Sequence, residues 1–341
     1  MKNTNNNNNN DYFCYSLRLS KHIVQISFIP SFLLLLFLIN SSSNQIVLGQ
    51  QSTSQVEDKV INIVVAGDFY CNDQTKETIE NIISVNPELI ITTGDHVNDK
   101  KSADCWIKTS KGIKDKMKIA IGNHDIEFPN IYKQIVDYHN VKNPYYSHDF
   151  QNVHFISMST EHPFEKGSKQ YEFITSDLEK ASTNSSIDWI IVHQHKTFYS
   201  THHDRLEAKQ LRDTFLPLYE KYDIDFIIYG HNQYYERTYP ILYNKEIEDK
   251  IDEEEIPQPR ITDNSLSNYQ NTTGIIFLTV GTAGDKLSSP KETPDYLVIQ
   301  QDDEFGFLNL KLENNGKTIV GEFRTGENGD DILDKFEVTK S

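Results

Sequence analysis

The sequence predicts an α/β fold for a single domain over residues 58–340. Seven short apolar runs, rich in β-branched residues, have the length and composition of buried strands. Amphipathic segments lie between several of these runs, and strands that alternate with helices favour an α/β architecture. Five of the seven runs end in polar residues, which is expected where strand ends meet in one crevice of an α/β sheet.

The expected elements follow one another along the chain. The predicted strands are Val60–Ala66, Glu88–Thr93, Met117–Ile121, Val153–Met158, Asp188–Val192, Ile224–Tyr229 and Gly274–Val280. Helical spacing of apolar residues predicts helices at Thr75–Val85, Gln170–Ala181 and Glu207–Tyr222. From Phe305 the chain alternates as antiparallel strands do, with turns beginning at Asn314 and Glu327. Residues 244–273 are polar and acidic and contain two prolines, which predicts a surface excursion.

Residues 1–49 are interpreted as an asparagine-rich leader followed by a signal peptide. Arg18 and Lys21 precede an apolar stretch over residues 28–39. This stretch is shorter than the roughly 20 residues of a membrane span and is typical of a signal-peptide core. Cleavage after Gly49 would remove this stretch, and no stable membrane span would be expected in the mature protein. The protein would then be secreted or lumenal, for example lysosomal or endosomal. An uncleaved anchor is the alternative, which Pro30 disfavours.

Charge and cysteine content limit the function classes. Lys and Arg number 33 against 50 Asp and Glu, so the net charge is −17. Such a chain repels a polyphosphate backbone, and we expect no nucleic-acid partner. Cys71 and Cys105 remain outside the leader, each shortly after a Gly-Asp turn, and a disulfide between them is expected in an oxidising compartment. Two unrelated thiols are the alternative. The glycosylation sequons at Asn184 and Asn271 agree with a secretory route.

Five polar blocks at strand ends carry the predicted chemistry. They are Gly67-Asp68, Gly94-Asp95, Gly122-Asn123-His124-Asp125, His193-Gln194-His195 and Gly230-His231-Asn232-Gln233. One Gly-Asp pair alone is usually a turn or a helix cap, but five blocks in succession indicate a shared site. Carboxylate, amide and imidazole groups suit iron, zinc or manganese, and the absence of thiolate ligands argues against a structural zinc finger.

In their order, these blocks resemble the calcineurin-like metallophosphoesterases. Within that superfamily, residues 170–173, 188–192 and 230–240 and the tail around Asp334 resemble the purple acid phosphatases. The resemblance covers about residues 60–338. It implies a four-layer sandwich of two packed mixed β-sheets flanked by helices, two bound metal ions and a small phosphorylated substrate. The sequence does not predict the oligomeric state.

The resemblance implies a complete second metal site. Asp95 would bridge two ions, and Asn123, His195 and His231 would complete the second, divalent site. His193 is expected to be a buried core histidine and not a ligand.

The first metal site departs from the family pattern. Asp68 is present, but Asn98 and Gln233 stand where the family has a tyrosine and a histidine. Neutral amides are weaker ligands than phenolate or imidazole. The first site is therefore expected to be weak or to hold a divalent ion, in a colourless protein. Tyr70 could supply a phenolate instead, although packing in its loop is the favoured role.

By the same resemblance, His124 would contact the phosphate or the leaving oxygen, and Asp125 would orient it. Alternatively, His124 would only form a hydrogen bond to the residues that bind the metal ions. His202 and His203 fall where the family often has substrate-side histidines, but their spacing from His195 differs. The predicted function is metal-dependent hydrolysis of phosphomonoesters. The alternatives are a phosphodiesterase or nucleotide-cleaving relative, a catalytically impaired relative that acts as a binding protein, and an unrelated α/β binding module.

Overall fold

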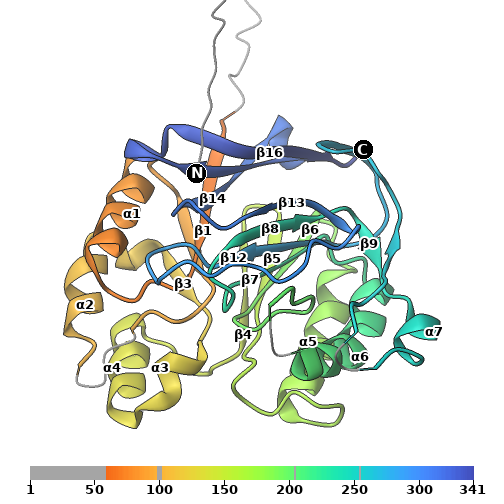
Figure 1. Cartoon of the computed structure of the whole chain (residues 1–341), viewed down its shortest axis with the longest axis horizontal. Coiled ribbons are helices and arrows are strands. Elements are labelled where there is room, and N and C mark those ends of the chain that lie inside the picture. The colour runs from red at the N-terminus through yellow and green to blue at the C-terminus, as the bar shows by residue number, and fades with distance from the viewer. Residues whose placement is uncertain (1–58, 98–101, 203–204, 253–254) are drawn as a thin grey trace, which may run out of the picture. The chain divides into compact units, whose positions relative to one another are not determined.

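Two seven-stranded sheets pack face to face in the computed structural model, which describes residues 59–97, 102–202, 205–252 and 255–341 (Figure 1). The first sheet contains β1 (Ile61–Ala66), β2 (Leu89–Thr92), β3 (Met117–Ile119), β11 (Asn268–Gln270), β14 (Phe307–Glu313), β15 (Thr318–Thr325) and β16 (Asp331–Thr339). The second contains β4 (Tyr146–Phe150), β5 (Val153–Ser157), β6 (Trp189–His193), β7 (Phe226–Tyr229), β8 (Tyr235–Thr238), β12 (Ile276–Val280) and β13 (Leu297–Gln301). The short strands β9 (Ile241–Leu242) and β10 (Arg260–Ile261) pair with each other.

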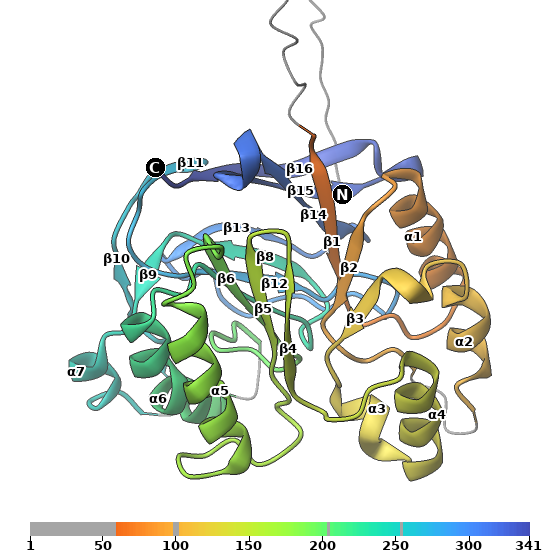
Figure 2. The same cartoon turned by 180° about the vertical axis from the view of Figure 1, so that it is seen from behind.

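The helices lie on the outer faces of the two sheets. They are α1 (Asp73–Ser84), α2 (Asp104–Ser110), α3 (Asn123–Glu127), α4 (Pro129–His139), α5 (Lys169–Ala181), α6 (Arg205–Lys221) and α7 (Lys245–Glu248). Figure 2 shows α1–α4 on the side of the first sheet and α5–α7 on the side of the second. This arrangement confirms the predicted four-layer sandwich.

Hydrophobic contacts hold these layers together. Between the sheets, Ile63 and Leu310 of the first sheet belong to one buried cluster with Phe155 and Ile228 of the second. Separate clusters join each outer face to its helices, through Trp106 of α2 on the first sheet and residues of α5 and α6 on the second. Central strands are thus covered on both faces, which explains why their sequences read as continuous apolar runs.

Strand direction brings the polar blocks to one region of the molecule. β1, β2 and β3 run parallel in the first sheet, and β5, β6, β7 and β12 run parallel in the second. β14 pairs antiparallel with β1, so the carboxyl-terminal hairpins extend the first sheet. All seven predicted strands and three predicted helices are present, with ends that differ by a few residues.

Two parts of the chain differ from expectation. The sequence patterns did not predict α2, α4, β4, β8 or β13. The predicted surface excursion at 244–273 is only partly right, because Tyr269 in β11 is fully buried and Glu248 pairs with the buried Arg212 at 3.0 Å. These polar side chains can be buried because residues far away in sequence supply an ion pair for Glu248 and a hydrogen bond for the Tyr269 hydroxyl. The predicted leader lies outside the described residues. In the described part of the chain, no helix is long and apolar enough to cross a bilayer.

Candidate metal centre

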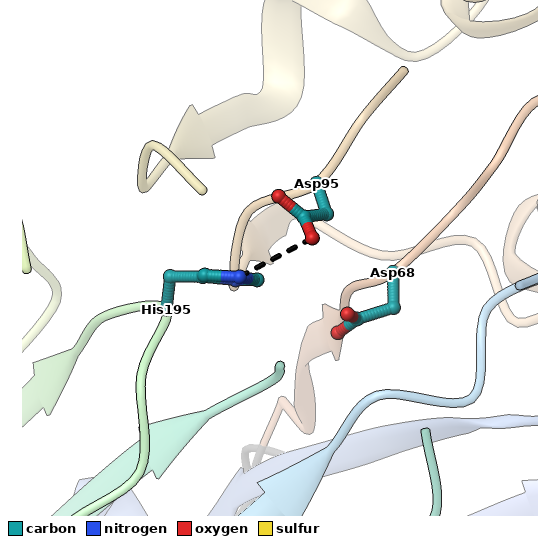
Figure 3. Close-up of side chains that lie close together, drawn as sticks. All are labelled: Asp68, Asp95 and His195. Carbon is teal, nitrogen blue, oxygen red and sulfur yellow. Dashed lines mark ion pairs between the residues drawn. The ribbon is translucent and has the colours of Figure 1, made fainter. Parts of the chain in front are cut away.

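Asp68, Asp95 and His195 lie close together at strand ends. Asp68 follows β1, Asp95 follows β2 and His195 follows β6. Figure 3 shows the three side chains pointing toward one another. One potential ligand atom from each lies within 4.8 Å of the other two, and all three residues are buried. Such convergence is expected where the carboxyl ends of parallel strands meet.

Asn123 and His231 extend this cluster. His195 Nε2 is 3.3 Å from Asp95 Oδ2 and 2.9 Å from Asn123 Oδ1. His231 Nδ1 is 3.1 Å from the same Asn123 oxygen and 3.2 Å from His195 Nε2. The structure therefore brings together the carboxylate, amide and two imidazoles that the sequence assigned to the second site.

The orientation of His195 is fixed by the backbone. Its Nδ1 lies 2.8 Å from the carbonyl oxygen of Thr93. A proton on Nδ1 donates to that carbonyl, which directs Nε2 toward Asp95 and Asn123. Metal-binding histidines commonly have this support on the ring nitrogen away from the ion.

Strained turns hold the potential ligands. Asp68, Asp95 and His231 have φ values of 61°, 52° and 68°, in the left-handed region that non-glycine residues rarely adopt. Space is equally restricted, because a Cβ at Gly122 would lie 2.1 Å from Asp95 Oδ1. Backbone strain of this kind gathers at functional sites, where the surrounding structure enforces it.

Burial and mutual proximity shift the protonation of the cluster. Burial, with the nearby Asp95 carboxylate, raises the pKa of Asp68 well above its usual value. Burial also acts to raise the pKa of Asp95, but His195 and His124 outweigh it and lower that pKa to about 2. Burial acts to lower the pKa of His195, whereas Asp95 and Asp68 raise it to about 10. Without a metal ion, the positive charge of protonated His195 thus offsets the negative charge at Asp68 and Asp95.

The donor set fits a metal ion. Asp68 Oδ2 accepts the backbone N–H of His231 at 2.9 Å, whereas Asp68 Oδ1 is buried and has no hydrogen-bond partner in the described structure. Buried polar atoms normally have a partner, and a carboxylate oxygen facing oxygen and nitrogen donors is suited to a divalent ion.

The buried Asp125 carboxylate accepts backbone hydrogen bonds from two loops. Its Oδ2 accepts the backbone N–H of Asp95 at 3.1 Å and of Gly122 at 2.9 Å. Its Oδ1 accepts the backbone N–H of His96 at 2.9 Å, and the His96 ring contacts Oδ2 at the same distance. The carboxylate thus ties together the loops that carry Asp95 and Asn123, and the orienting role expected of Asp125 stays a prediction.

His124 lies half-buried beside Asp95. Its backbone N–H donates to Asp95 Oδ1 at 2.9 Å, and its Nδ1 is 3.3 Å from the exposed Glu127 carboxylate. This places a titratable ring beside the cluster.

The remaining predicted site residues are more dispersed. The Gln233 side chain turns back onto its own loop and donates from Nε2 to the carbonyl of His231 at 3.0 Å. His202 is half-buried, and its backbone N–H donates to Ser200 Oγ at 3.4 Å. The Tyr70 side chain is 45% exposed. Asn98 and His203 lie outside the described residues.

His193 is a buried core residue, as expected. Its Nδ1 lies 3.3 Å from the carbonyl oxygen of Thr92, and burial lowers its pKa to about 4.

The expected disulfide is confirmed. Cys71 and Cys105 are bonded, with 6.1 Å between their Cα atoms. The bond joins the loop after Asp68 to α2, which packs on the outer face of the first sheet.

Two residues near the cluster were missed at the level of the sequence. The His96 ring contacts Asp125 through Nδ1 and Thr92 Oγ1 through Nε2, the latter at 2.7 Å. No sequence motif around His96 indicated these contacts. Asp285 lies beside Asp68, whose carbonyl accepts the Asp285 N–H at 2.8 Å. A signal was available, because Gly284-Asp285 is a further Gly-Asp pair shortly after a predicted strand.

Several known proteins are similar to this chain in sequence. "Probable inactive purple acid phosphatase 27" of Arabidopsis thaliana is 30% identical over 57% of this chain and 30% of its own length. "Purple acid phosphatase 15" of the same plant is 22% identical over 82% of this chain and 62% of its own length. The chain thus spans less than two thirds of these curated relatives.

Solved structures show the same fold at lower identity. A purple acid phosphatase from yellow lupin seeds superposes with a TM-score of 0.64 at 21% identity, over 84% of this chain and 55% of that one. "GAP50 the anchor in the inner membrane complex of Plasmodium" gives 0.60 at 15% identity, over 82% of this chain and 89% of that one.

The sequence profile described as calcineurin-like phosphoesterase matches residues 61–235, which include β1 to β7 and every ligand candidate from Asp68 to His231. This family binds a dinuclear metal centre and acts on phosphorylated substrates, in agreement with the buried cluster of Asp68, Asp95 and His195. The chain is similar to purple acid phosphatases, and it belongs to the calcineurin-like phosphoesterases.

Proposed function

We propose that the protein is a metal-dependent phosphatase that hydrolyses phosphomonoesters. The observation that carries this proposal is the convergence of Asp95, Asn123, His195 and His231, whose donor atoms approach one another within 2.9–3.3 Å. These are the residue types that hold the divalent ion in purple acid phosphatases, and each occupies the matching block.

Each side chain has a role in this proposal. Asp95, Asn123, His195 and His231 would hold one ion, and Asp68 with Asp95 would hold the other. Such ions, when bound, polarise phosphoryl oxygens and lower the pKa of water. His124 would donate a proton to the departing oxygen, with its backbone fixed by Asp95 and its ring facing Glu127.

We propose a secretory route and a secreted or lumenal location. The Cys71–Cys105 disulfide is typical of oxidising compartments. The sequon residues Asn184 and Asn271 are both exposed, so glycosylation is sterically open at each.

The direct test measures turnover and metal content on the same purified protein. Hydrolysis of p-nitrophenyl phosphate is compared with that of bis(p-nitrophenyl) phosphate after loading with iron, zinc or manganese. We expect metal-dependent turnover of the monoester, lost in Asn123→Ala. His162→Ala is the control, since His162 contacts Ser159 and is not one of the clustered ligand candidates. Preference for the diester would support a phosphodiesterase instead.

A catalytically impaired binding protein is the second candidate. The Gln233 amide nitrogen is engaged by the His231 carbonyl, and several relatives are named probable inactive purple acid phosphatases. The fold also occurs in a Plasmodium protein described as an anchor. Metal binding without turnover on either substrate would favour this alternative.

A further inference from the structure

The segment after β12 is attached to the loop that carries Asp68. Ala283 N–H donates to the carbonyl of Gly67 at 3.0 Å, and Asp285 N–H donates to the carbonyl of Asp68 at 2.8 Å. The Asn72 side chain donates to the carbonyl of Gly284 at 2.7 Å. These bonds come from residues more than 200 positions away in sequence, and they fix Asp285 beside Asp68.

The segment after β12 also packs closely against the loop that carries Asp68. A Cβ at Gly284 would lie 2.5 Å from the carbonyl oxygen of Phe69. At Gly281, a Cβ would lie 3.0 Å from Asp68 Oδ2 and 2.1 Å from the Asn232 carbonyl oxygen. Residues 281–284 therefore pack so closely against the Asp68 loop that no side chain fits at Gly281 or Gly284.

The Asp285 carboxyl group adds a third acid to the cluster. It is half-buried and interacts electrostatically with Asp68, Asp95 and His124. Among the described residues, no lysine or arginine forms an ion pair with any of these three acids. Buried carboxylates require such compensation; the His195–Asp95 pair at 3.3 Å supplies part of it, and a cation at Asp68 would supply more.

The unpartnered Asp68 Oδ1 shows where compensation is missing. It is buried on the residue to which Asp285 is attached, while the neutral Gln233 amide turns away to the His231 carbonyl. Asp285 is outside the group whose ligand atoms lie within 4.8 Å of one another. Any effect of Asp285 on a cation beside Asp68 would therefore be exerted through its charge.

We propose that Asp285 supplies negative charge to the cation site at Asp68 and raises the affinity of that site for a divalent ion. The proposal rests on the proposed function only in that both use this site.

Manganese titration tests the proposal without any substrate. Binding of Mn²⁺ to the full chain is followed by the electron paramagnetic resonance signal of the free ion. We expect the wild type to bind two ions, one more tightly than the other. Asp285→Asn keeps the backbone bond to Asp68 and the side-chain size, and should weaken the looser site by about tenfold or more while changing the tighter site less than about twofold.

Two further variants complete the experiment. Asp285→Glu retains the charge and should retain most of the affinity, whereas Asp330→Asn removes an exposed charge from another loop and should behave as wild type. Equal affinities in Asp285→Asn and wild type would overturn the proposal, as would a wild type that binds a single ion. Two bound ions without any phosphatase activity would refute the proposed function and leave the role of Asp285 standing.

Discussion

At the residue scale, each potential ligand in the cluster is positioned by a neighbour that fixes one atom. His195 is held by the Thr93 carbonyl, and Asp68 Oδ2 by the N–H of His231. Because several side chains act on one ion, the effect of removing one depends on the others.

Loss of a single imidazole should disable the whole site. His195→Ala and His231→Ala should each abolish turnover and lower the metal content, while circular dichroism shows a retained fold. The double variant should be no worse than either single one, because the residues act as a unit. Full activity in His195→Ala would remove this residue from the site.

Asp125 should contribute to the stability of the fold and to metal binding, because it holds two loops of the site in place. Asp125→Asn weakens charge-assisted hydrogen bonds to two loops, and we expect a loss of about 2–3 kcal/mol in the free energy of unfolding. Urea denaturation measures this loss, and metal content should fall with it. Asp149→Asn, at a carboxylate 54% exposed, should cost less than about 1 kcal/mol. Equal costs in both variants would contradict the assigned role.

At the element scale, β8 is stabilised by polar contacts. Glu236 is 3% exposed, accepts the Gln300 amide of β13 at 2.6 Å and is also contacted by the hydroxyl of Thr201. Burial raises the pKa of Glu236 to about 7. The tyrosines near this carboxyl are Tyr229, Tyr234 and Tyr296.

This raised pKa predicts a pH-dependent stability. The folded chain holds a proton on Glu236 that the unfolded chain releases near pH 4.5. The stabilising contribution is therefore complete below about pH 4.5 and is lost as the pH rises through about 7, in total about 3 kcal/mol. Urea denaturation at several pH values should show this slope in wild type and its absence in Glu236→Gln. Parallel pH profiles of the two proteins would contradict it.

The disulfide between the Asp68 loop and α2 should matter for stability. Cys71 and Cys105 are 34 positions apart, and closing a loop of this length contributes about 3–4 kcal/mol by the chain-entropy estimate. The double variant Cys71→Ser/Cys105→Ser should lose about this free energy of unfolding. Wild type assayed with a reducing agent should approach the variant, and no difference between oxidised and reduced protein would refute the prediction.

The elements that could be predicted share a physical property. β1, β6 and β7 are buried on both faces, so apolar runs alone reveal them. β8 could not be found in this way, because Glu236 and Arg237 are buried beside partners far away in sequence. The ligand candidates could be predicted because polar residues follow those apolar strands, whereas the contacts of Asp125 depend on loop geometry that the sequence does not show.

At the scale of the whole molecule, one ion pair joins the two sheets. Arg237 of β8 donates from Nε to Asp334 Oδ2 of β16 at 2.6 Å and from Nη2 to Oδ1 at 2.8 Å. Arg237 also donates to the hydroxyl of Tyr269 in β11 at 3.0 Å. The pair is almost fully buried, at 1% and 7% side-chain exposure.

Removal of this arginine should destabilise the assembly of the two sheets. Arg237→Ala leaves Asp334 charged and buried, and the expected cost is about 3–5 kcal/mol. Thermal unfolding should show it as a lowered midpoint. Lys245→Ala removes an exposed pair with Asp249 and should change the midpoint little. A similarly small change in Arg237→Ala would show that this ion pair contributes little to holding the two sheets together.

The pairing of β1 with β14 also determines the order of events during synthesis. Ile63 in β1 lies opposite Leu310 in β14, so the strand that leads into Asp68 obtains this neighbour only after more than 240 further residues have been synthesised. Until then, β1 has an open edge toward the missing hairpins, and open edges invite pairing with other chains. Such long-range pairing slows folding. A nascent chain therefore needs β14 to β16 before the first sheet is complete, and chaperone occupancy should persist until these strands have been translated.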